Sequence, residues 1–206
     1  MAEQYKSAGI KETRIQMEDF QPIIDAIEFQ KSYLFKIILP YSIKVAQDKG
    51  NIIVSNPIQY CVSNTSFPTS TTANQAVAFF NSELKVASKT TYTDWSITFR
   101  CDTGSSGKTG NAVAYLGDIP LNTYEYFNYW RGCVFWELDR VSSLPKDYKR
   151  DFDLILLDER GEASKKFTIF GGWPAGITGG DLNYSTDSIL TFNVAFTFDR
   201  FMFSNV

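Results

Sequence analysis

Residues 190–199 read LTFNVAFTFD, and this stretch decides the fold class of the 206-residue chain. Apolar and polar side chains alternate along it without interruption. The apolar set is Leu190, Phe192, Val194, Phe196 and Phe198, and the other set is Thr191, Asn193, Ala195, Thr197 and Asp199. Because successive side chains of a β-strand point to opposite faces, this pattern predicts a strand with one buried and one polar face.

The same reading extends to other parts of the chain. Residues 92–99 oppose Trp95, Ile97 and Phe99 to Asp94, Ser96 and Thr98. Further strands are predicted at 34–39, 58–63, 152–157 and 166–170, and the last two are joined through a turn at 158–161. Aromatic residues make up 16% of the chain, which favours half-buried sheet over helix. We therefore predict a mainly β, antiparallel fold.

Two segments have the periodicity of helices. The first has Pro22 in its first turn and an apolar stripe of Phe20, Ile23, Ile24 and Ile27. The second is capped by Asn122 or Thr123, and its expected apolar face is Tyr124, Phe127, Trp130 and Val134. Residues 63–73 and 104–110 are predicted to be polar loops.

Composition excludes several classes of function. The net charge of -3 provides no global basic field of the kind that grips nucleic acid. The chain has no apolar run of about 18 residues and its N-terminus lacks a secretory signal, so we expect a soluble cytosolic product. Cys61, Cys101 and Cys133 are expected to be buried thiols. The absence of histidine removes the Ser-His-Asp and Cys-His arrangements and the commonest zinc ligand, and we expect neither metal nor cofactor.

Residues 100–110, RCDTGSSGKTG, contain two signatures of enzymes. Gly107, Lys108 and Thr109 resemble the end of a phosphate-binding loop, but the glycine that such a loop requires at its first position is Asp102, whose carboxylate would repel the anion. Asp102, Thr103 and Gly104 match the catalytic triplet of aspartic proteases, which need two carboxylates sharing a proton. The chain has one such triplet, so only a dimeric aspartic hydrolase using Asp102 remains as an alternative to a simple Gly/Ser loop.

An ordered set of short phrases resembles the tail tube proteins of contractile-tailed, T-even-type phages, over about residues 33–203. The phrases are YLFKI at 33–37, YCVSNTSFP at 60–68, KVA at 85–87, TYTDWSITF at 91–99, and IFGGWP at 169–174. The predicted helix that contains Trp130 falls where the family has its helix. On this resemblance the family-motif residues are Phe67, Pro68, Tyr92, Asp94, Trp95, Trp130, Trp173 and Pro174.

The resemblance implies a β-sandwich or partial barrel at 33–206 with one packed helix. The chain departs from the compact family form in its longer arm at 1–32, which carries the short amphipathic helix, and in its longer region at 104–120. It implies strands that join those of neighbouring copies, because a closed ring satisfies the exposed strand edges. Six copies would form a ring, and stacked rings would form the inner tail tube, which conducts DNA during ejection without binding it specifically. The arm stripe then becomes a candidate subunit contact, and Thr191, Asn193, Thr197 and Asp199 become candidates for a lumen or solvent face.

The resemblance also implies partners and a location. The tail sheath, baseplate and tape-measure proteins are the expected partners, the virion tail is the expected location, assembly takes place in the host cytoplasm, and no membrane insertion or enzymatic activity is expected. Two alternatives share the fold: a tube-initiator or tube-end protein at the baseplate, and a ring of the type VI secretion kind. A carbohydrate-binding sandwich is an alternative of another class, which exposed aromatic side chains would support.

Overall fold

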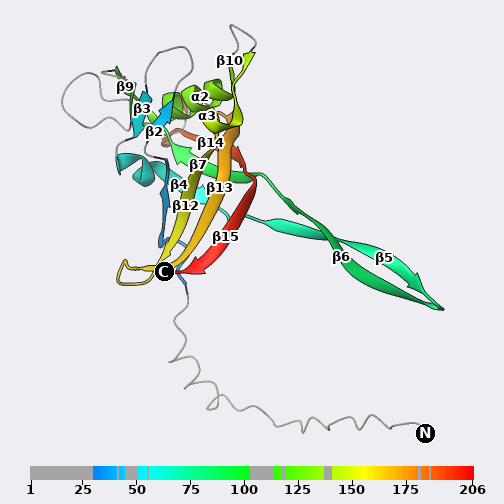
Figure 1. The fold of residues 1–206 in the computed structure, drawn as a ribbon. Coiled ribbons are helices and arrows are strands. Elements are labelled where there is room, and N and C mark those ends of the chain that lie inside the picture. The colour runs from blue at the N-terminus through cyan, green and yellow to red at the C-terminus, as the bar shows by residue number, and fades with distance from the viewer. Residues whose placement is uncertain are drawn as a thin grey trace, which may run out of the picture.

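A computed structural model describes residues 30–40, 42–44, 51–54, 56–102, 114–116, 119–136, 141–180, 182–185 and 187–206. The predicted arm stripe at Phe20, Ile23, Ile24 and Ile27 and the predicted loop at 104–110 lie outside the described residues. The described part is mainly β, and all its paired strands are antiparallel (Figure 1).

The strands, in chain order, are β1 (Phe35–Ile38), β2 (Ser42–Lys44), β3 (Asn51–Val54), β4 (Val62–Thr65), β5 (Ser70–Phe79), β6 (Ser82–Tyr92), β7 (Trp95–Arg100), β8 (Ala114–Leu116), β9 (Ile119–Leu121), β10 (Phe135–Trp136), β11 (Val141–Ser142), β12 (Arg150–Leu157), β13 (Ala163–Thr178), β14 (Thr191–Thr197) and β15 (Arg200–Asn205). The helices are η1 (Asn56–Cys61), α2 (Thr123–Val134) and α3 (Pro145–Tyr148).

Strand β13 organises the main sheet, because its two halves pair with different strands. Its first half lies between β12 and β15, and its second half pairs with β14. The resulting order is β1-β12-β13-β14-β7-β4, with β15 beside the first half of β13. The polypeptide thus passes from one half of the sheet to the other within a single long strand.

The core lies between these two halves. The ring of Trp95 on β7 stacks on the ring of Phe152 on β12, with centroids 6.0 Å apart, so the two halves of the sheet face each other. Helix α2 packs against the same core through Phe127 and Trp130, whose rings lie near Phe196 at 5.8 and 5.9 Å. The helix begins where the sequence predicted, because the Asn122 side chain accepts a hydrogen bond from the Glu125 backbone, while the Glu125 carboxylate accepts one from the Asn122 backbone.

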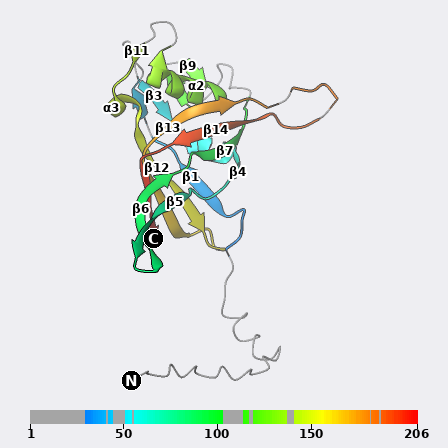
Figure 2. The same cartoon turned by 90° about the vertical axis from the view of Figure 1, so that its right-hand side faces the viewer.

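A two-stranded hairpin formed by β5 and β6 projects away from this body (Figures 1 and 2). All of its strand residues are exposed, in contrast to the half-buried strands of the main sheet. The remaining short strands form the sheet β2-β3-β8-β9 and the pair β10-β11 at the end of the body that also carries α2 and α3 (Figure 1).

The structure confirms the predicted strands at the C-terminus, at 34–39, at 152–157 and at 166–170, and it confirms the hairpin connection at 158–161. Phe192, Val194, Phe196 and Phe198 are buried as expected, but Leu190 precedes the strand and is 38% exposed.

Three local predictions were wrong. Residues 58–61 form the end of a 3-10 helix instead of a strand, and strand pairing begins only at Val62. Residues 63–73 are largely strand, because the β-branched threonines that made them look like a polar loop also suit an exposed strand. The buried face of α2 is rotated from the predicted one: Tyr124 is 41% exposed, and Thr123, Tyr126 and Cys133 are buried instead.

Candidate assembly surfaces

The projecting hairpin has two chemically different faces in its outer half. Strand pairing places Val77 opposite Leu84 and Phe79 opposite Ser82, whereas Ala76 is opposite Lys85 and Ala78 is opposite Glu83. Since side chains alternate along each strand, Val77, Phe79, Leu84 and Val86 share one face, and Glu83 and Lys85 lie on the other. We call the first set the apolar hairpin face.

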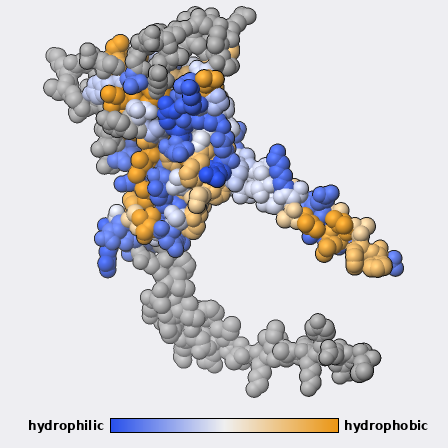
Figure 3. All heavy atoms as spheres, viewed as in Figure 1, coloured by the Kyte–Doolittle hydropathy of each residue, from blue (hydrophilic) through white to orange (hydrophobic). Residues whose placement is uncertain are grey.

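Among the described residues of the body, none buries the apolar hairpin face. Val77, Phe79, Leu84 and Val86 are 47%, 62%, 60% and 46% exposed. Apolar residues dominate the far end of the projection in Figure 3. These fractions leave roughly 400 Å² of apolar surface in water, which is comparable with the largest patches on monomeric proteins, about 300–600 Å² and often functional. A two-stranded hairpin is marginally stable without such a face being covered.

The root of the hairpin is polar and tightly held. Thr72 and Thr90 share a hydrogen bond of 2.9 Å across the two strands, and the Thr93 amide donates to the Thr69 carbonyl at 3.2 Å. Below them the buried indole of Trp95 donates from Nε1 to the Ser66 carbonyl at 2.6 Å. Trp95 therefore joins the chain that enters the hairpin to the core of the body.

Five of the sequence-predicted family-motif residues meet at this root. Besides Trp95, Pro68 is buried, and Asp94 accepts a hydrogen bond from the Thr197 hydroxyl at 2.8 Å. Phe67 stacks on Phe167 of β13 at 5.4 Å, and Tyr92 lies 5.7 Å from the ring of Phe201 on β15. The resemblance in sequence had singled out these positions, and in the structure they lie together at the root of the hairpin.

An aromatic surface begins beside the root of the hairpin and continues over β13 and β15. We call it the aromatic patch, and it consists of Phe67, Tyr92, Phe167, Phe201 and Phe203. The ring of Phe167 lies 4.9 Å from that of Phe203 and 6.2 Å from that of Phe201, so the members form a continuous layer. Phe67 and Phe203 are 54% and 51% exposed. The patch thus offers a second apolar surface on the same chain.

The other three family-motif residues gather around Tyr148 at the end of α3. Trp130, which is fully buried, donates from Nε1 to the Tyr148 carbonyl at 2.8 Å. Trp173 is half-buried and meets the Tyr148 ring edge-on at 5.6 Å, and Pro174 beside it is buried. These residues hold α3 against the second half of β13.

A sharp bend of β13 lies just before Trp173. Gly171 has a φ of +62°, and a Cβ there would clash with a carboxylate oxygen of Asp199. A Cβ on Gly172 would clash with the ring of Phe152. The pair of glycines therefore lets β13 bend closely over its neighbours, and this gives a physical reason for the Gly-Gly in the predicted motif.

The predicted polar face of the C-terminal strand is a continuous surface on the main sheet. Asn193 accepts a hydrogen bond from the Ser96 hydroxyl at 2.7 Å, and strand pairing places Thr98 opposite Asn193 and Thr191 opposite Arg100. Thr197 lies on the same face and bonds Asp94. Asp199 is at the bend after β14, where it pairs with Lys149 at 2.6 Å instead of extending this face. We call the surface around Ser96, Thr98 and Asn193 the polar sheet face.

Asp102 has a structural role that the sequence did not reveal. Its Oδ1 accepts hydrogen bonds from the backbone amide of Thr123 at 2.7 Å and from the Thr123 hydroxyl at 2.5 Å. Thr123 is buried at the first turn of α2, where backbone amides lack partners within the helix and a negative charge is stabilising. Asp102 thus anchors the helix.

The thiols and the buried phenol show the effects of burial. Burial raises the pKa of the Cys61 and Cys101 thiols, and the nearby Asp102 carboxylate acts in the same direction. The two side chains are half-buried, whereas Cys133 is buried as expected. Burial also raises the pKa of the Tyr126 hydroxyl well above 10, and this hydroxyl has no hydrogen-bond partner among the described residues.

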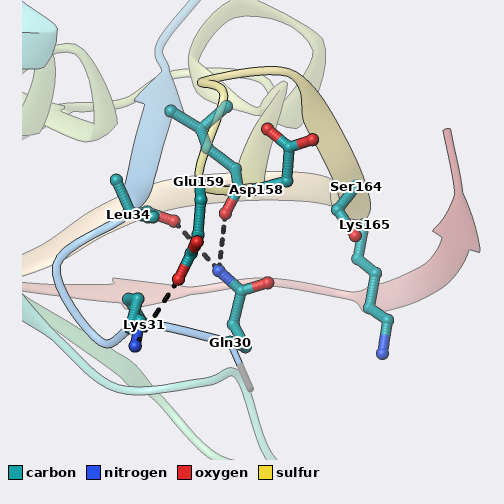
Figure 4. A pocket seen from close by; sticks show the side chains of 8 residues that line it. Gln30, Lys31, Leu34, Asp158, Glu159, Ser164 and Lys165 are labelled. Atoms are coloured by element: carbon teal, nitrogen blue, oxygen red, sulfur yellow. Dashed lines mark hydrogen bonds and ion pairs between the residues drawn. The ribbon is translucent and has the colours of Figure 1, made fainter. Parts of the chain in front are cut away.

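A small polar pocket lies where the described chain begins, at the turn between β12 and β13 (Figure 4). Gln30 donates from Nε2 to the Leu157 carbonyl at 2.7 Å, and Lys31 pairs with Glu159 at 3.5 Å. Both contacts fasten the segment entering β1 to this turn. The pocket is lined by charged side chains of both signs and serves as an attachment point of the chain.

Two absences hold for the described residues. No group of three or more histidine, cysteine or carboxylate side chains there has an arrangement that would hold a metal ion. No helix there combines the length and apolar character that crossing a bilayer requires.

Comparisons with known proteins agree on one fold. The family model described as "Phage tail tube protein" matches residues 28–204. The chain is similar in structure to a chain of the anti-feeding prophage cap, its tube terminating cap, with a TM-score of 0.54 and 11% identity, covering 87% of this chain and 94% of that chain. It is also similar to a chain of the anti-feeding prophage baseplate, with a TM-score of 0.52 and 12% identity over 86% and 97% of the two chains.

A third similar structure is the sheath/tube terminator, in the extended state, of the PVC extracellular contractile injection system. The TM-score is 0.52 and the identity is 13%, covering 86% of this chain and 99% of that chain. At these identities the likeness concerns the fold alone. No curated protein matches the chain in sequence.

Proposed function

The chain belongs to the phage tail tube protein family, and from this premise we propose that it forms hexameric rings that stack into the inner tube of a contractile phage tail and conduct DNA during ejection. The observation that carries the proposal is the uncovered apolar hairpin face. A projecting two-stranded hairpin with one apolar face gains stability only when a partner covers that apolar face. In a tube protein the nearest abundant partner is another copy of the chain.

The proposed lumen is lined by the polar sheet face. Its side chains are mostly short and uncharged, with Arg100 at the end of β7 as the exception, and hydrogen bonds within the sheet already occupy several of them, such as Ser96 with Asn193. Affinity for DNA comes mainly from lysine and arginine contacts with phosphate, so a surface of this kind lets DNA pass without holding it. The net charge of -3 acts in the same direction.

The proposed partners follow from the family and from the settings of similar folds. We propose the tail sheath, baseplate and tape-measure proteins as partners, the virion tail as the location, and the host cytoplasm as the place of assembly without membrane insertion. The similar chains come from a baseplate, a cap and a sheath/tube terminator of contractile systems, which supports a position along such an axis.

The family is a structural one, and Asp102 fits this assignment. Both hydrogen bonds that the structure gives its carboxylate are to Thr123 at the start of α2, so its role is to hold a helix. An aspartic hydrolase would instead need this carboxylate close to a second one that shares a proton. Trp95 and Trp130 are buried and cannot form a platform for a sugar ring, so a carbohydrate-binding sandwich would have to use the exposed rings of the aromatic patch instead.

The self-assembly can be tested by shortening the hairpin. Replacing residues 73–89 by a two-residue Asn-Gly turn removes the outer part of the hairpin and leaves its root, including the Thr72–Thr90 bond, in place. We expect the full chain to form rings or tubes at high concentration, measured by light scattering after size exclusion, and the shortened chain to remain a folded monomer. A full chain that stays monomeric at millimolar concentration would contradict the proposal.

The same measurement separates the repeating subunit from a tube-end protein. A repeating subunit gives particles that lengthen with concentration, because each ring offers the surface on which the next ring stacks. A tube-initiator or tube-end protein of the same fold gives rings of one size that do not lengthen.

A further inference from the structure

The aromatic patch and the apolar hairpin face are two different apolar surfaces on one chain. The patch is a layer of rings backed by strands β13 and β15, with Phe67 and Phe203 about half exposed. The hairpin face is narrow and stands out from the body (Figures 1 and 3). A projecting surface and a broad one can complement each other, and both occur on every copy.

The chain's own hairpin cannot fold back over its own patch. Tyr92 belongs to the patch and is also the last residue of β6, so the hairpin starts at the patch and leads away from it. Between Tyr92 and Leu84 the strand advances by roughly 27 Å, at about 3.4 Å per residue. The apolar hairpin face of the same copy is therefore out of reach of the patch.

We propose that the aromatic patch receives the apolar hairpin face of a second copy of this chain. This assignment rests on the proposed self-assembly and adds the receiving surface to it. The contact would place Leu84 and Phe79 against the rings of Phe167 and Phe203, and apolar contacts of this kind with aromatic rings are favourable. The opposite hairpin face keeps Glu83 and Lys85 in water, which avoids the cost of burying either charge.

The geometry of this contact explains how it repeats. The donating and receiving surfaces differ, so the contact is heterologous, and each copy that receives a hairpin still has its own hairpin to donate. Because the hairpin root borders the patch through Phe67 and Tyr92, one contact leads directly to the next. Such a chain of contacts closes into a ring or continues as a filament.

Another exposed apolar group competes for the role of receiver. It includes Leu182, Tyr184 and Ile189, which are 85%, 112% and 68% exposed and lie in the connection between β13 and β14. These side chains are carried by a connection instead of a paired strand, so they form a less rigid surface than the rings backed by β13 and β15. This connection is the alternative receiver that the experiment must separate from the patch.

The test mixes two variants that each lack one surface. Leu84→Asp introduces a charge into the apolar hairpin face, and Phe203→Asp introduces a charge into the aromatic patch. Ala76→Asp and Ser204→Asp are the matched controls, since each also replaces a neutral side chain by one negative charge but on the opposite face of its strands. We expect Leu84→Asp and Phe203→Asp to be monomeric alone and to form a dimer of one copy of each when mixed, because one compatible pair of surfaces then remains. The controls should assemble like the parent chain.

A photo-crosslinking side chain at position 84 gives a second readout that does not depend on a charged variant. In a mixture of light and heavy-isotope chains, we expect links between copies to peptides that contain Phe167 or Phe203. Links to residues 182–190, or normal assembly of Phe203→Asp, would overturn the patch as receiver while leaving self-assembly intact. A parent chain that neither assembles nor crosslinks between copies would contradict the proposed function itself.

Discussion

Replacing Trp95 by phenylalanine tests whether the contacts at the root of the hairpin are needed for assembly. The substitution removes the hydrogen bond to the Ser66 carbonyl, worth about 1 kcal/mol. It also removes roughly 40 Å² of buried ring, worth about 1 kcal/mol, and leaves a small cavity beside Phe152. We expect the free energy of unfolding to fall by about 2–3 kcal/mol and the Tm by roughly 5–10 °C, since 1 kcal/mol corresponds to about 2–4 °C for a domain of this size.

Trp130→Phe is the matched control. Trp130 is equally buried and its indole makes an equivalent bond, to the Tyr148 carbonyl at 2.8 Å, but it holds α3 and not the hairpin. Differential scanning calorimetry should therefore give similar losses for the two variants. Light scattering well below both Tm values should show that Trp95→Phe needs about tenfold more protein to assemble, the equivalent of about 1.4 kcal/mol, and that Trp130→Phe assembles like the parent chain. Equal effects of the two variants on assembly would refute a role of the hairpin root in assembly.

Three further predictions concern the body of the chain. Gly171→Ala should lower the free energy of unfolding by about 2–3 kcal/mol, because the new Cβ meets Asp199 and φ is positive. Gly161→Ala is the control: its φ is +81° but no atom lies near its Cβ, so it should lower the free energy of unfolding by about 1 kcal/mol. Equal losses for the two variants in urea unfolding would contradict the close approach of Asp199 to Gly171. Tyr126→Phe should be neutral or stabilising by about 1 kcal/mol, since the buried hydroxyl has no hydrogen-bond partner among the described residues. Burial raises the pKa of Tyr126 in the folded state, so the parent chain should lose stability as the pH rises above about 10, where the hydroxyl ionises in the unfolded chain. The free energy of unfolding of Tyr126→Phe should therefore exceed that of the parent chain by more at pH 11 than at pH 8. The same difference between the two chains at both pH values would contradict this. Asp102→Ala should lower the free energy of unfolding by about 1–2 kcal/mol and leave assembly intact, and detection of a peptidase activity lost with this substitution would contradict the structural role of Asp102.

The central strands could be predicted from the sequence because one of their faces is buried in the chain's own core. Trp95, Ile97 and Phe99, and likewise Phe192, Val194 and Phe196, alternate with polar residues because only one side of each strand meets the core. The start of α2 was equally predictable, since Asn122 and Glu125 form a capping box.

The hairpin could not be predicted in the same way. Thr71, Thr72, Asn74 and Gln75 of its root half face water on both sides, so alternation is absent there and appears only between Val77 and Val86. A strand that is stabilised by another copy does not have to follow the pattern set by its own core. The resemblance marked Tyr92, Asp94 and Trp95, but their common role at the hairpin root depends on contacts with Ser66, Thr197 and Phe201 that are distant in sequence.

The bend of β13 illustrates another limit of sequence reasoning. The Gly-Gly at 171–172 could be read as a turn, whereas the structure places it within a strand that stays paired on both sides of the bend. Only the approach of Asp199 and Phe152 explains why side chains are excluded at both positions. Likewise Asp102, which the sequence presents as part of a protease triplet, is assigned to the start of α2 by its contacts with Thr123.

Electron microscopy of the purified full chain at high concentration, with the mass determined on the same sample, tests the central claim most directly. We predict hollow particles with sixfold end views, either single rings or stacked tubes, and a mass that is a multiple of six chains. A homogeneous dimer, or particles with no central channel, would contradict the assignment of this chain as a tube-forming subunit.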